Sequence, residues 1–299
     1  MGMDVEATAL GPTMLVAIDQ YSSVPLVHDP YAGRMLPLAW RIPLWLCRFS
    51  AVRRALVAAS DRSGPGAWIS LLCRKRYIDD ALRRAAQHGL DAIVIVGAGL
   101  DTRAYRVAEL AGVPVWEIDL PANIAAKTRA LHRCFGHIPA NVTLVPMDLA
   151  ADDLPEQLVN SGFDPTMRTF FIWESVTMYL AEPAVRKTLQ SLARCATESR
   201  LVFTYFLRDF VDGQAMYGAQ AAYQRFVTKK GLWVYGIDPA DVAGLLGEYG
   251  WQQTEHVGPD EYRERYLAPA GRLQPVSEIE RAVCAEHTNT STPSDSGAM

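Results

Sequence analysis

The sequence predicts an α/β protein with a mostly parallel sheet that carries helices on both faces, plus a helical N-terminal cap and a helical insertion. Three observations predict this class. Five apolar, strand-like runs alternate with helix-like stretches from residue 91 onward, which is typical of a parallel sheet. The first run ends in a glycine-rich turn, and residues 1–90 are mainly helical in pattern. A chain of 299 residues with 49% hydrophobic residues can bury a full core.

The cap is expected over residues 1–70. Its most apolar segment, residues 36–59, contains two prolines and four arginines, which is too much charge for a spanning helix. We interpret this segment as cap helices, with an interfacial membrane helix as the alternative. The core is expected over residues 71–270 and begins with a helix at 71–90, whose apolar positions recur at helical spacing before Gly89 stops it.

The later elements follow in order along the chain. Strands are expected at residues 92–98, 114–119, 142–148, 169–175, 200–206 and 251–258. A helical insertion is expected at about residues 207–236, and a short helix after it has Asp238 as its cap and Pro239 in its first turn. The C-terminal segment spans residues 271–299, and its polar end, residues 286–299, is expected to be loose.

Charge and cysteine content exclude several classes of function. The formal net charge of −4 gives no electrostatic basis for a nucleic-acid partner. The five cysteines form no CxxC pair, so reduced thiols and a cytoplasmic location are expected. No signal-peptide pattern opens the chain, and no membrane partner is expected. The histidines, among them His28, His132 and His137, lack metal-ligand spacing, so no metal is expected.

The turn after the first strand, "GAGLDTR", is the first candidate for a ligand site. In an open parallel sheet the ligand lies beyond the carboxyl ends of the strands. Gly97 and Gly99 permit a tight turn and a close approach of a ligand. Thr102 stands where a dinucleotide fingerprint has a third small residue. Asp101 would cap the helix and oppose a pyrophosphate, so the turn favours a ligand without phosphates.

Two further strand ends carry acids. Glu117 and Asp119 end the second strand, and a carboxylate there can accept both hydroxyls of a ribose. Asp148 ends the third strand and can accept a hydrogen bond from an exocyclic amine such as that of adenine. A nucleoside with a cationic tail fits this set, and S-adenosylmethionine is the common cofactor of that kind. Glu174 follows an apolar strand, where a carboxylate needs a partner, and is expected at the cationic side of the ligand.

These residues resemble a known family, the leucine carboxyl methyltransferase and polyketide O-methyltransferase (tetracenomycin-type) superfamily of class I S-adenosylmethionine-dependent enzymes. The similar stretches are "RKRYIDDAL", "VIVGAGLDTRAYR", "VWEIDLP", "VPMDL" and "FIWESVTMYL", within about residues 70–206. The resemblance implies a Rossmann-like methyltransferase core.

The resemblance also implies roles for residues. An arginine of the leading helix would bind the carboxylate of the cofactor; Arg76 is preferred and Arg74 remains open. Gly97 and Gly99 would meet the methionine portion, and Glu174 would form the floor of the site. Asp119 would bind the ribose, supported by Glu117, and Asp148 with Leu149 would contact the adenine.

The predicted reaction is methyl transfer to oxygen of a small molecule, at a carboxyl or hydroxyl group of a polyketide-like or other natural product. A carboxylate needs no general base, whereas a hydroxyl benefits from one, and no catalytic residue is assigned. Arg34 or Arg208 could pair with a substrate carboxylate. An aromatic pocket could be formed by Tyr21, Tyr31, Trp173, Tyr179, Phe206, Tyr217 and Tyr223.

Two other functions remain open at this point. A nicotinamide-dependent oxidoreductase shares the βαβ start with an acid about twenty residues later. A non-catalytic module that binds S-adenosylmethionine is the other alternative. The sequence gives no prediction of the oligomeric state or of the methyl acceptor.

Overall fold

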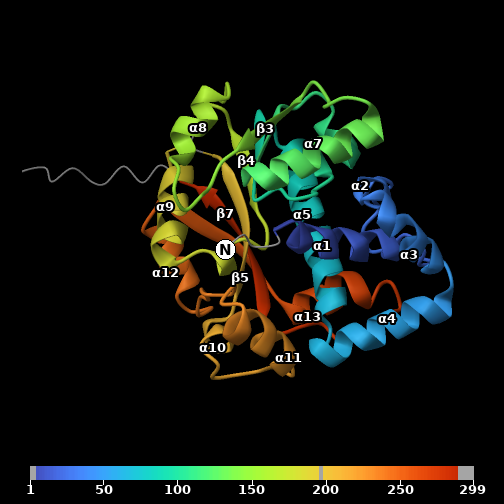
Figure 1. Cartoon of the computed structure of the whole chain (residues 1–299). Helices are drawn as coiled ribbons and strands as arrows, with labels where there is room; N and C mark the ends of the chain where they lie inside the picture. The colour runs from blue at the N-terminus through green and yellow to red at the C-terminus, as the bar shows by residue number, and fades with distance from the viewer. Residues whose placement is uncertain (1–4, 195–197, 289–299) are drawn as a thin grey trace, which may run out of the picture.

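A seven-stranded sheet forms the centre of the protein, in the order β3-β2-β1-β4-β5-β7-β6 (Figure 1). The computed structural model describes residues 5–194 and 198–288, with side chains from residue 10 onward. The strands are β1 (Ala92–Val96), β2 (Val115–Asp119), β3 (Val142–Pro146), β4 (Thr169–Trp173), β5 (Arg200–Phe206), β6 (Trp251–Val257) and β7 (Glu280–His287). The six predicted strands lie where the sequence placed them, and the mostly parallel α/β class is confirmed.

Six of the seven strands, β1 to β6, run in the same direction, and β7 alone runs against them. β1 pairs with both β2 and β4, whereas β7 runs antiparallel between β5 and β6. After β1 the chain builds outward through β2 and β3 and then returns to the other side of β1 with β4. This reversal places a crevice at the carboxyl end of β1, which is where ligands bind in open α/β sheets.

Helices cover both faces of the sheet (Figure 1). They are α1 (Val5–Asp19), α2 (Ala32–Met35), α3 (Arg41–Leu46), α4 (Ser50–Ser63), α5 (Ala67–Gln87), α6 (Arg103–Arg106), α7 (Pro121–Phe135), α8 (Leu154–Asn160), α9 (Glu182–Leu192), α10 (Arg208–Val211), α11 (Gln220–Ala222), α12 (Val242–Gly247) and α13 (Pro259–Tyr262). Local signals set several of their ends: α7 begins at a proline and ends before Gly136, which has a φ of +79°. Asp153 caps α8 by accepting from the Glu156 amide.

Alternate residues of each central strand point to different layers. Val94 and Val96 of β1 belong to the core that includes residues of α8, α9 and α12. Ile93 and Ile95 belong to the core that includes residues of α1 and α5. Because both faces are covered, β1 is apolar throughout and buried along its whole length.

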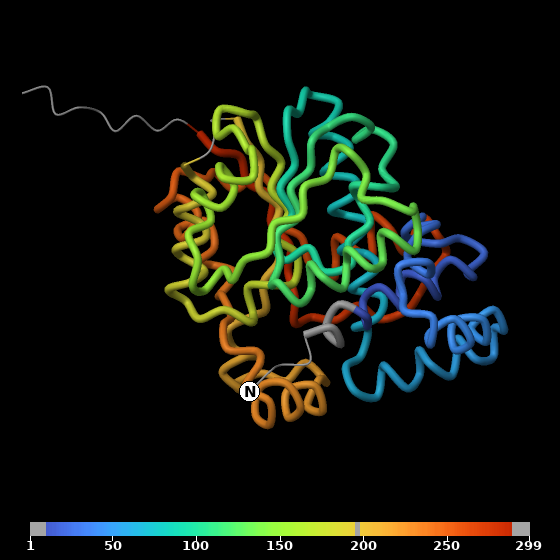
Figure 2. Tube along the Cα trace, turned by 45° about the horizontal axis from the view of Figure 1, so that its top comes forward, coloured from blue at the N-terminus to red at the C-terminus, as the bar shows by residue number. Residues whose placement is uncertain are grey.

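The N-terminal helices and the insertion meet beside the sheet. Figure 2 shows the N-terminal helices in blue and the insertion after β5 in orange, both below the strands. α11 of the insertion packs against α4. The insertion consists of α10, α11 and a π-helical turn, η4 (Tyr223–Lys229), so it is helical only in short pieces. No helix among residues 5–194 and 198–288 is long and apolar enough to cross a bilayer.

Two predicted boundaries are corrected. The segment 271–299 is not separate from the core, because β7 lies in it and hydrogen-bonds between β5 and β6. Glu286 and His287 of the predicted tail are part of this strand, while residues 289–299 lie outside the described residues. The helix expected from Asp238 begins instead at Val242. The Asp238 side chain accepts from the Ala240 amide at 2.9 Å and so caps the preceding turn.

Candidate functional site

The glycine turn after β1 is fixed by its backbone and its neighbours. Gly97 and Gly99 have φ values of +73° and +46°, the left-handed region that favours glycine. A Cβ atom on Gly97 would lie 2.2 Å from Cγ2 of Val176. The Gly97 amide donates to the carbonyl of Ile118 at 2.8 Å, which ties the turn to β2. The turn therefore requires glycine at Gly97, where Val176 packs directly against the backbone.

Asp119 joins the ends of β1 and β2. Its Oδ2 atom accepts from the Gly99 amide at 2.6 Å, and its Oδ1 atom accepts from the Leu120 amide and from Asn123 Nδ2, both at 2.7 Å. The side chain is half-buried. Each carboxylate oxygen can accept two hydrogen bonds, so Oδ2 retains capacity for a ligand hydroxyl. Gly99 and Asp119, which the sequence analysis assigned to one ligand site, are therefore in direct contact.

Glu174, directly after β4, is surrounded by cations. Its carboxylate lies 2.8 Å from Nε of Arg74, 3.3 Å from Nζ of Lys75 and 2.7 Å from Nη1 of Arg103. Burial alone would raise the pKa of Glu174, but these three cations outweigh burial and hold the pKa well below its usual range. The next residue, Ser175, has a φ of +55°, an uncommon conformation for a residue other than glycine. Glu174 is therefore a fixed anion that orients three cations.

The two arginines that the sequence left open lie on different sides of α5. Arg74 is buried, and besides Glu174 it contacts Glu280 of β7 through Nη1 at 2.5 Å. Arg76 is half-exposed and bonds Asp80 of its own helix at 3.0 Å. The preference for Arg76 is therefore corrected, because Arg74 is the arginine whose guanidinium reaches the strand ends. A sequence position alone could not distinguish two arginines separated by one residue.

Arg103 was missed as a site residue, although its motif was noted. It is 1% exposed, and besides Glu174 it contacts Asp101 and Asp79, the latter at 2.8 Å. Asp79 also receives two bonds of 2.7 Å from Arg106. The signal available in the sequence was the pairing of "IDD" on the leading helix with two arginines in "DTRAYR", which places opposite charges on packed elements.

Asp101 fulfils half of its predicted role. Its Oδ1 atom accepts from the amide of Arg103, the first residue of α6, at 2.7 Å, although Thr102 rather than Asp101 holds the N-cap position. Burial would raise the pKa of Asp101, but Arg103 and Lys75 lower it overall. Because Arg103 neutralises this carboxylate, its repulsion of a phosphate is weaker than the sequence alone suggested.

Glu117 pairs with a lysine of α7. It is fully buried on β2, 2.7 Å from Nζ of Lys127, and accepts from the Tyr105 hydroxyl at 2.7 Å. Burial raises the pKa of Glu117 despite the opposing charge of Lys127. This buried pair fastens α7 to β2, the strand whose last residue is Asp119.

Asp148 and Leu149 extend the same edge of the sheet. The chain reaches them through Met147, whose amide donates to the carbonyl of Asp119 at 2.9 Å. Asp148 is exposed and accepts from the Ala150 amide at 2.9 Å. Leu149 is partly buried against the core. A polar acceptor beside an apolar side chain at this edge matches the chemistry of an adenine.

Of the aromatic residues predicted for a substrate pocket, Trp173, Tyr179, Phe206 and Tyr223 belong to one core cluster, whereas Tyr21, Tyr31 and Tyr217 lie outside it. Tyr179 and Phe206 pack in one core cluster, and Trp233 of the insertion packs edge-on to Phe206 with a ring distance of 4.7 Å. Trp173 is fully buried inside the core, so its expected place in a pocket is corrected. Tyr223 packs against Phe210.

The remaining pocket candidates lie elsewhere. Tyr31 packs edge-on against Phe135 of α7. Arg34 contacts the carbonyl of Cys134. Tyr21 and Tyr217 are each 39% exposed, and the Tyr217 hydroxyl bonds Asp209.

Other candidates have ordinary partners. Arg208 pairs with Asp241 at 3.3 Å. His28, His132 and His137 are exposed. In the part of the chain that the structure describes, no group of three or more histidine, cysteine or acidic side chains is arranged to hold a metal ion.

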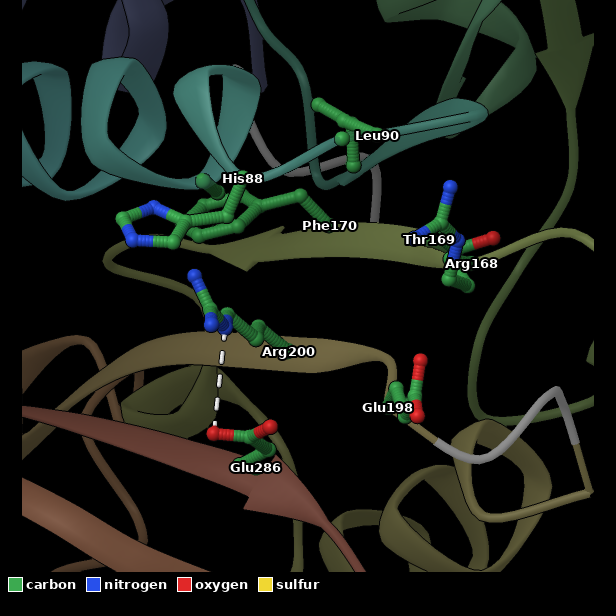
Figure 3. Close-up of a pocket in the computed structure, with 10 residues that line it drawn as sticks. His88, Leu90, Arg168, Thr169, Phe170, Glu198, Arg200 and Glu286 are labelled. Atoms are coloured by element: carbon green, nitrogen blue, oxygen red, sulfur yellow. Dashed lines mark ion pairs between the residues drawn. The ribbon is translucent and has the colours of Figure 1, made fainter.

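A cavity of about 130 Å³ lies at the amino ends of the parallel strands, opposite the glycine turn (Figure 3). Its lining includes Thr169 and Arg200, the first residues of β4 and β5. Arg200 faces Glu286 across it at 3.8 Å. This cavity is therefore separate from the crevice at the carboxyl ends of the strands.

Comparison with known proteins finds relatives of one kind. The profile of the family described as leucine carboxyl methyltransferase matches residues 9–193. A relative in Mycobacterium tuberculosis H37Rv, named as an S-adenosyl-L-methionine-dependent methyltransferase, is 31% identical over 90% of this chain and 79% of its own. A relative of the same description in Frankia alni is 30% identical over 95% of this chain and 96% of its own.

Solved structures show the same fold at lower identity. A crystal structure of a methyltransferase from Thermobifida fusca has a TM-score of 0.60 at 17% identity and covers 79% of this chain and 88% of its own. A DUF574 family protein from Streptomyces avermitilis has a TM-score of 0.57 at 12% identity, over 92% of this chain and 97% of its own. The predicted resemblance is confirmed: the chain belongs to the leucine carboxyl methyltransferase family.

Proposed function

We propose that this methyltransferase transfers a methyl group to an oxygen atom of a small molecule, with a carboxyl group as the preferred acceptor. S-adenosylmethionine is the methyl donor, as the names of the relatives state for those proteins. The observation that carries the proposal is the bond from the Gly99 amide to Asp119, which joins a ligand-accepting turn to a partly exposed carboxylate. Family membership sets aside the nicotinamide-dependent oxidoreductase and the non-catalytic module.

The residues at the strand ends suit the parts of this cofactor. Asp119 would accept the ribose hydroxyls, and Asp148 with Leu149 would hold the adenine. Gly97 and Gly99 would leave room for the methionine portion. Its carboxylate would meet Arg74 or Lys75, which Glu174 already orients. In this assignment Glu174 positions cations rather than touching the sulfonium.

In methyl transfer the main task of the protein is to position the two reactants. When bound, the cofactor supplies an electrophilic methyl group on a sulfonium. The chain must hold the acceptor oxygen in line and keep water away. Glu174 and Asp101 are poor proton acceptors, because nearby cations lower both pKa values. An acceptor that is already ionised, such as a carboxylate, therefore fits this site better than a hydroxyl.

The acceptor side of the site is proposed near Tyr179, Phe206 and Trp233. These side chains join the end of β5 to the insertion. Flat apolar surfaces of this kind suit an aromatic or polyketide-like skeleton. A cytoplasmic location is consistent with the free cysteines Cys47, Cys73, Cys134 and Cys284.

Calorimetric titration followed by an acceptor screen tests the proposal. We expect S-adenosylhomocysteine to bind and NAD not to bind. Aromatic and polyketide-like carboxylic acids should gain one methyl group by mass spectrometry, more readily than the matching phenols. Methylation of amines or thiols alone would overturn the assignment to oxygen, and faster methylation of phenols would overturn the preference for carboxyl groups.

Asp119→Ala should weaken S-adenosylhomocysteine binding by about 1.5–3 kcal/mol, because a charged hydrogen-bond acceptor is lost. Asp91→Ala is the matched control: Asp91 is an exposed acid that pairs with Arg168 just before β1, at the opposite edge. The same titration should show a larger loss for Arg74→Gln than for Arg76→Gln. Equal losses for Asp119→Ala and Asp91→Ala would remove Asp119 from the site.

A further inference from the structure

Two helices of the cap bury no residue. α3 and the following α4 have no buried side chain, and neither has the turn η1 (Leu38–Trp40) before them. Ile42 is 73% exposed and Trp45 is 48% exposed. We call the exposed apolar side chains of this region the cap patch; they are Leu38, Trp40, Ile42, Trp45, Leu46, Phe49 and Leu56. Exposed apolar side chains gathered in one stretch of the chain mark a candidate binding face.

The charge around the cap patch is mainly positive; Asp61, near the end of α4, is an acid and accepts from the Gly66 amide. Residues 31–60 contain five arginines and no aspartate, glutamate or lysine, although the whole chain has a net charge of −4. The guanidinium of Arg48 lies 4.0 Å from the ring centre of Trp45 and 4.8 Å from that of Phe49. Within the described residues, Arg48, Arg53 and Arg54 form no ion pair; Arg53 bonds backbone carbonyls and Arg54 bonds Ser50.

The combination of apolar side chains and arginines favours one kind of binding partner for the cap patch. A second copy of the chain, related by a two-fold axis, would place arginines against arginines, which is unfavourable. A nucleic acid would satisfy the arginines but leave Ile42 and Leu38 against phosphates and water. A bilayer with anionic headgroups suits both the apolar side chains and the arginines of the cap patch. Tryptophan and aliphatic side chains enter the boundary between headgroups and acyl chains, while guanidinium groups contact the lipid phosphates.

We propose that the cap patch docks on the surface of a membrane that carries anionic lipids. The contact is peripheral, because α3 has 6 residues and α4 has 14, too few to cross a bilayer. From the sequence we expected no membrane partner and kept an interfacial membrane helix as the alternative for residues 36–59. This proposal adopts that alternative. The proposal does not depend on the identity of the methyl acceptor.

Vesicle flotation of the full chain tests this proposal. The probes are vesicles of phosphatidylcholine alone and vesicles of phosphatidylcholine and phosphatidylglycerol in equal amounts. We expect binding to the mixed vesicles, weak binding to the neutral ones, and release by added salt. Arg48→Ala combined with Arg54→Ala should weaken binding about 25-fold, since each arginine near an anionic surface contributes about fivefold. Ile42→Ser combined with Trp45→Ser should weaken it at least as much.

Matched controls use exposed side chains away from the cap. Val159 of α8 is 50% exposed, close to the 48% of Trp45, so Val159→Ser controls for the loss of apolar surface, and Arg168→Ala controls for the loss of charge. Both should bind vesicles as the wild type does. Titration with S-adenosylhomocysteine should be unchanged in the cap variants, which shows that they are folded and separates this test from that of the proposed function.

Three outcomes would overturn the proposal. One is equal binding to neutral and anionic vesicles. Another is equal loss of binding in the control variants. The third is no vesicle binding together with a dimer, seen by light scattering, that Ile42→Ser with Trp45→Ser dissociates; the patch would then be a protein interface.

Discussion

Helices α4 and α5 are consecutive in the chain but differ in what they bury. α4 ends at Ser63 and buries no side chain, whereas α5 begins at Ala67 and buries twelve residues. Arg54 of α4 is exposed and donates to the hydroxyl of Ser50. Arg74 of α5 is buried between two carboxylates, Glu174 and Glu280. The same residue type therefore serves two purposes, fixing a site in one helix and presenting a charged surface in the other.

The difference has a physical origin. A buried guanidinium loses its hydration and needs carboxylates to compensate, so each buried arginine constrains the elements that carry its partners. Arg74 and Arg103 tie α5 and α6 to the ends of β4 and β7. An exposed arginine makes no such demand and remains free to meet a partner outside the chain.

The largest expected effect distinguishes two neighbouring aspartates of α5. Asp79→Asn should lower the free energy of unfolding by about 3–5 kcal/mol, because it removes the buried carboxylate that Arg103 and Arg106 share. Asp80→Asn should cost about 0.5 kcal/mol, because Asp80 pairs with Arg76 and Arg83 near the surface. Urea unfolding measures both values. Similar losses would contradict the distinction between buried and exposed pairs.

Two leucine substitutions compare how much α4 and α5 contribute to stability through apolar packing alone. Leu82→Ala in α5 should cost about 2–5 kcal/mol, because Leu82 is fully buried and its removal leaves a cavity. Leu56→Ala in α4 should change stability by less than about 0.5 kcal/mol, because Leu56 is 40% exposed. Thermal unfolding compares the variants. A large loss for Leu56→Ala would show that the outer face of α4 is packed against the protein.

The smallest effect is a dependence on pH. Burial would raise the pKa of Asp79, but Arg106 and Arg103 lower it overall. A lowered folded-state pKa stabilises the protein above the unfolded-state pKa of about 3.9, and this stability is lost as pH falls. The difference in unfolding free energy between wild type and Asp79→Asn should therefore narrow from pH 7 to pH 3. A constant difference would show that Asp79 does not titrate differently in the folded state.

Much of the sheet was predictable because its strands carry local signals. β1 and β4 are continuous apolar runs bounded by turn residues, and their ends at Gly97 and Glu174 follow directly. β7 was missed because its apolar run, "AVCA", is short and has polar or charged residues on both sides. Its place between β5 and β6 depends on pairing with strands far away in the sequence.

The candidate site was predicted in part for the same reason. Gly97, Gly99 and Asp119 adjoin strand ends, so their position at one edge of the sheet followed from the strand pattern. The cations around Glu174 did not follow, because Arg74 and Glu174 are 100 positions apart. Their contact depends on which face of α5 packs against the sheet.

The sequence by itself determined the fold class, the order of the predicted strands and the family, because apolar periodicity and short motifs act locally. Only the tertiary structure decided that Arg74 rather than Arg76 reaches the strand ends, that Arg103 joins them, and that residues 38–56 form an exposed apolar and cationic face. The physical reason is that burial depends on which elements pack together. Two arginines with the same local pattern can therefore lie in the core or in solvent.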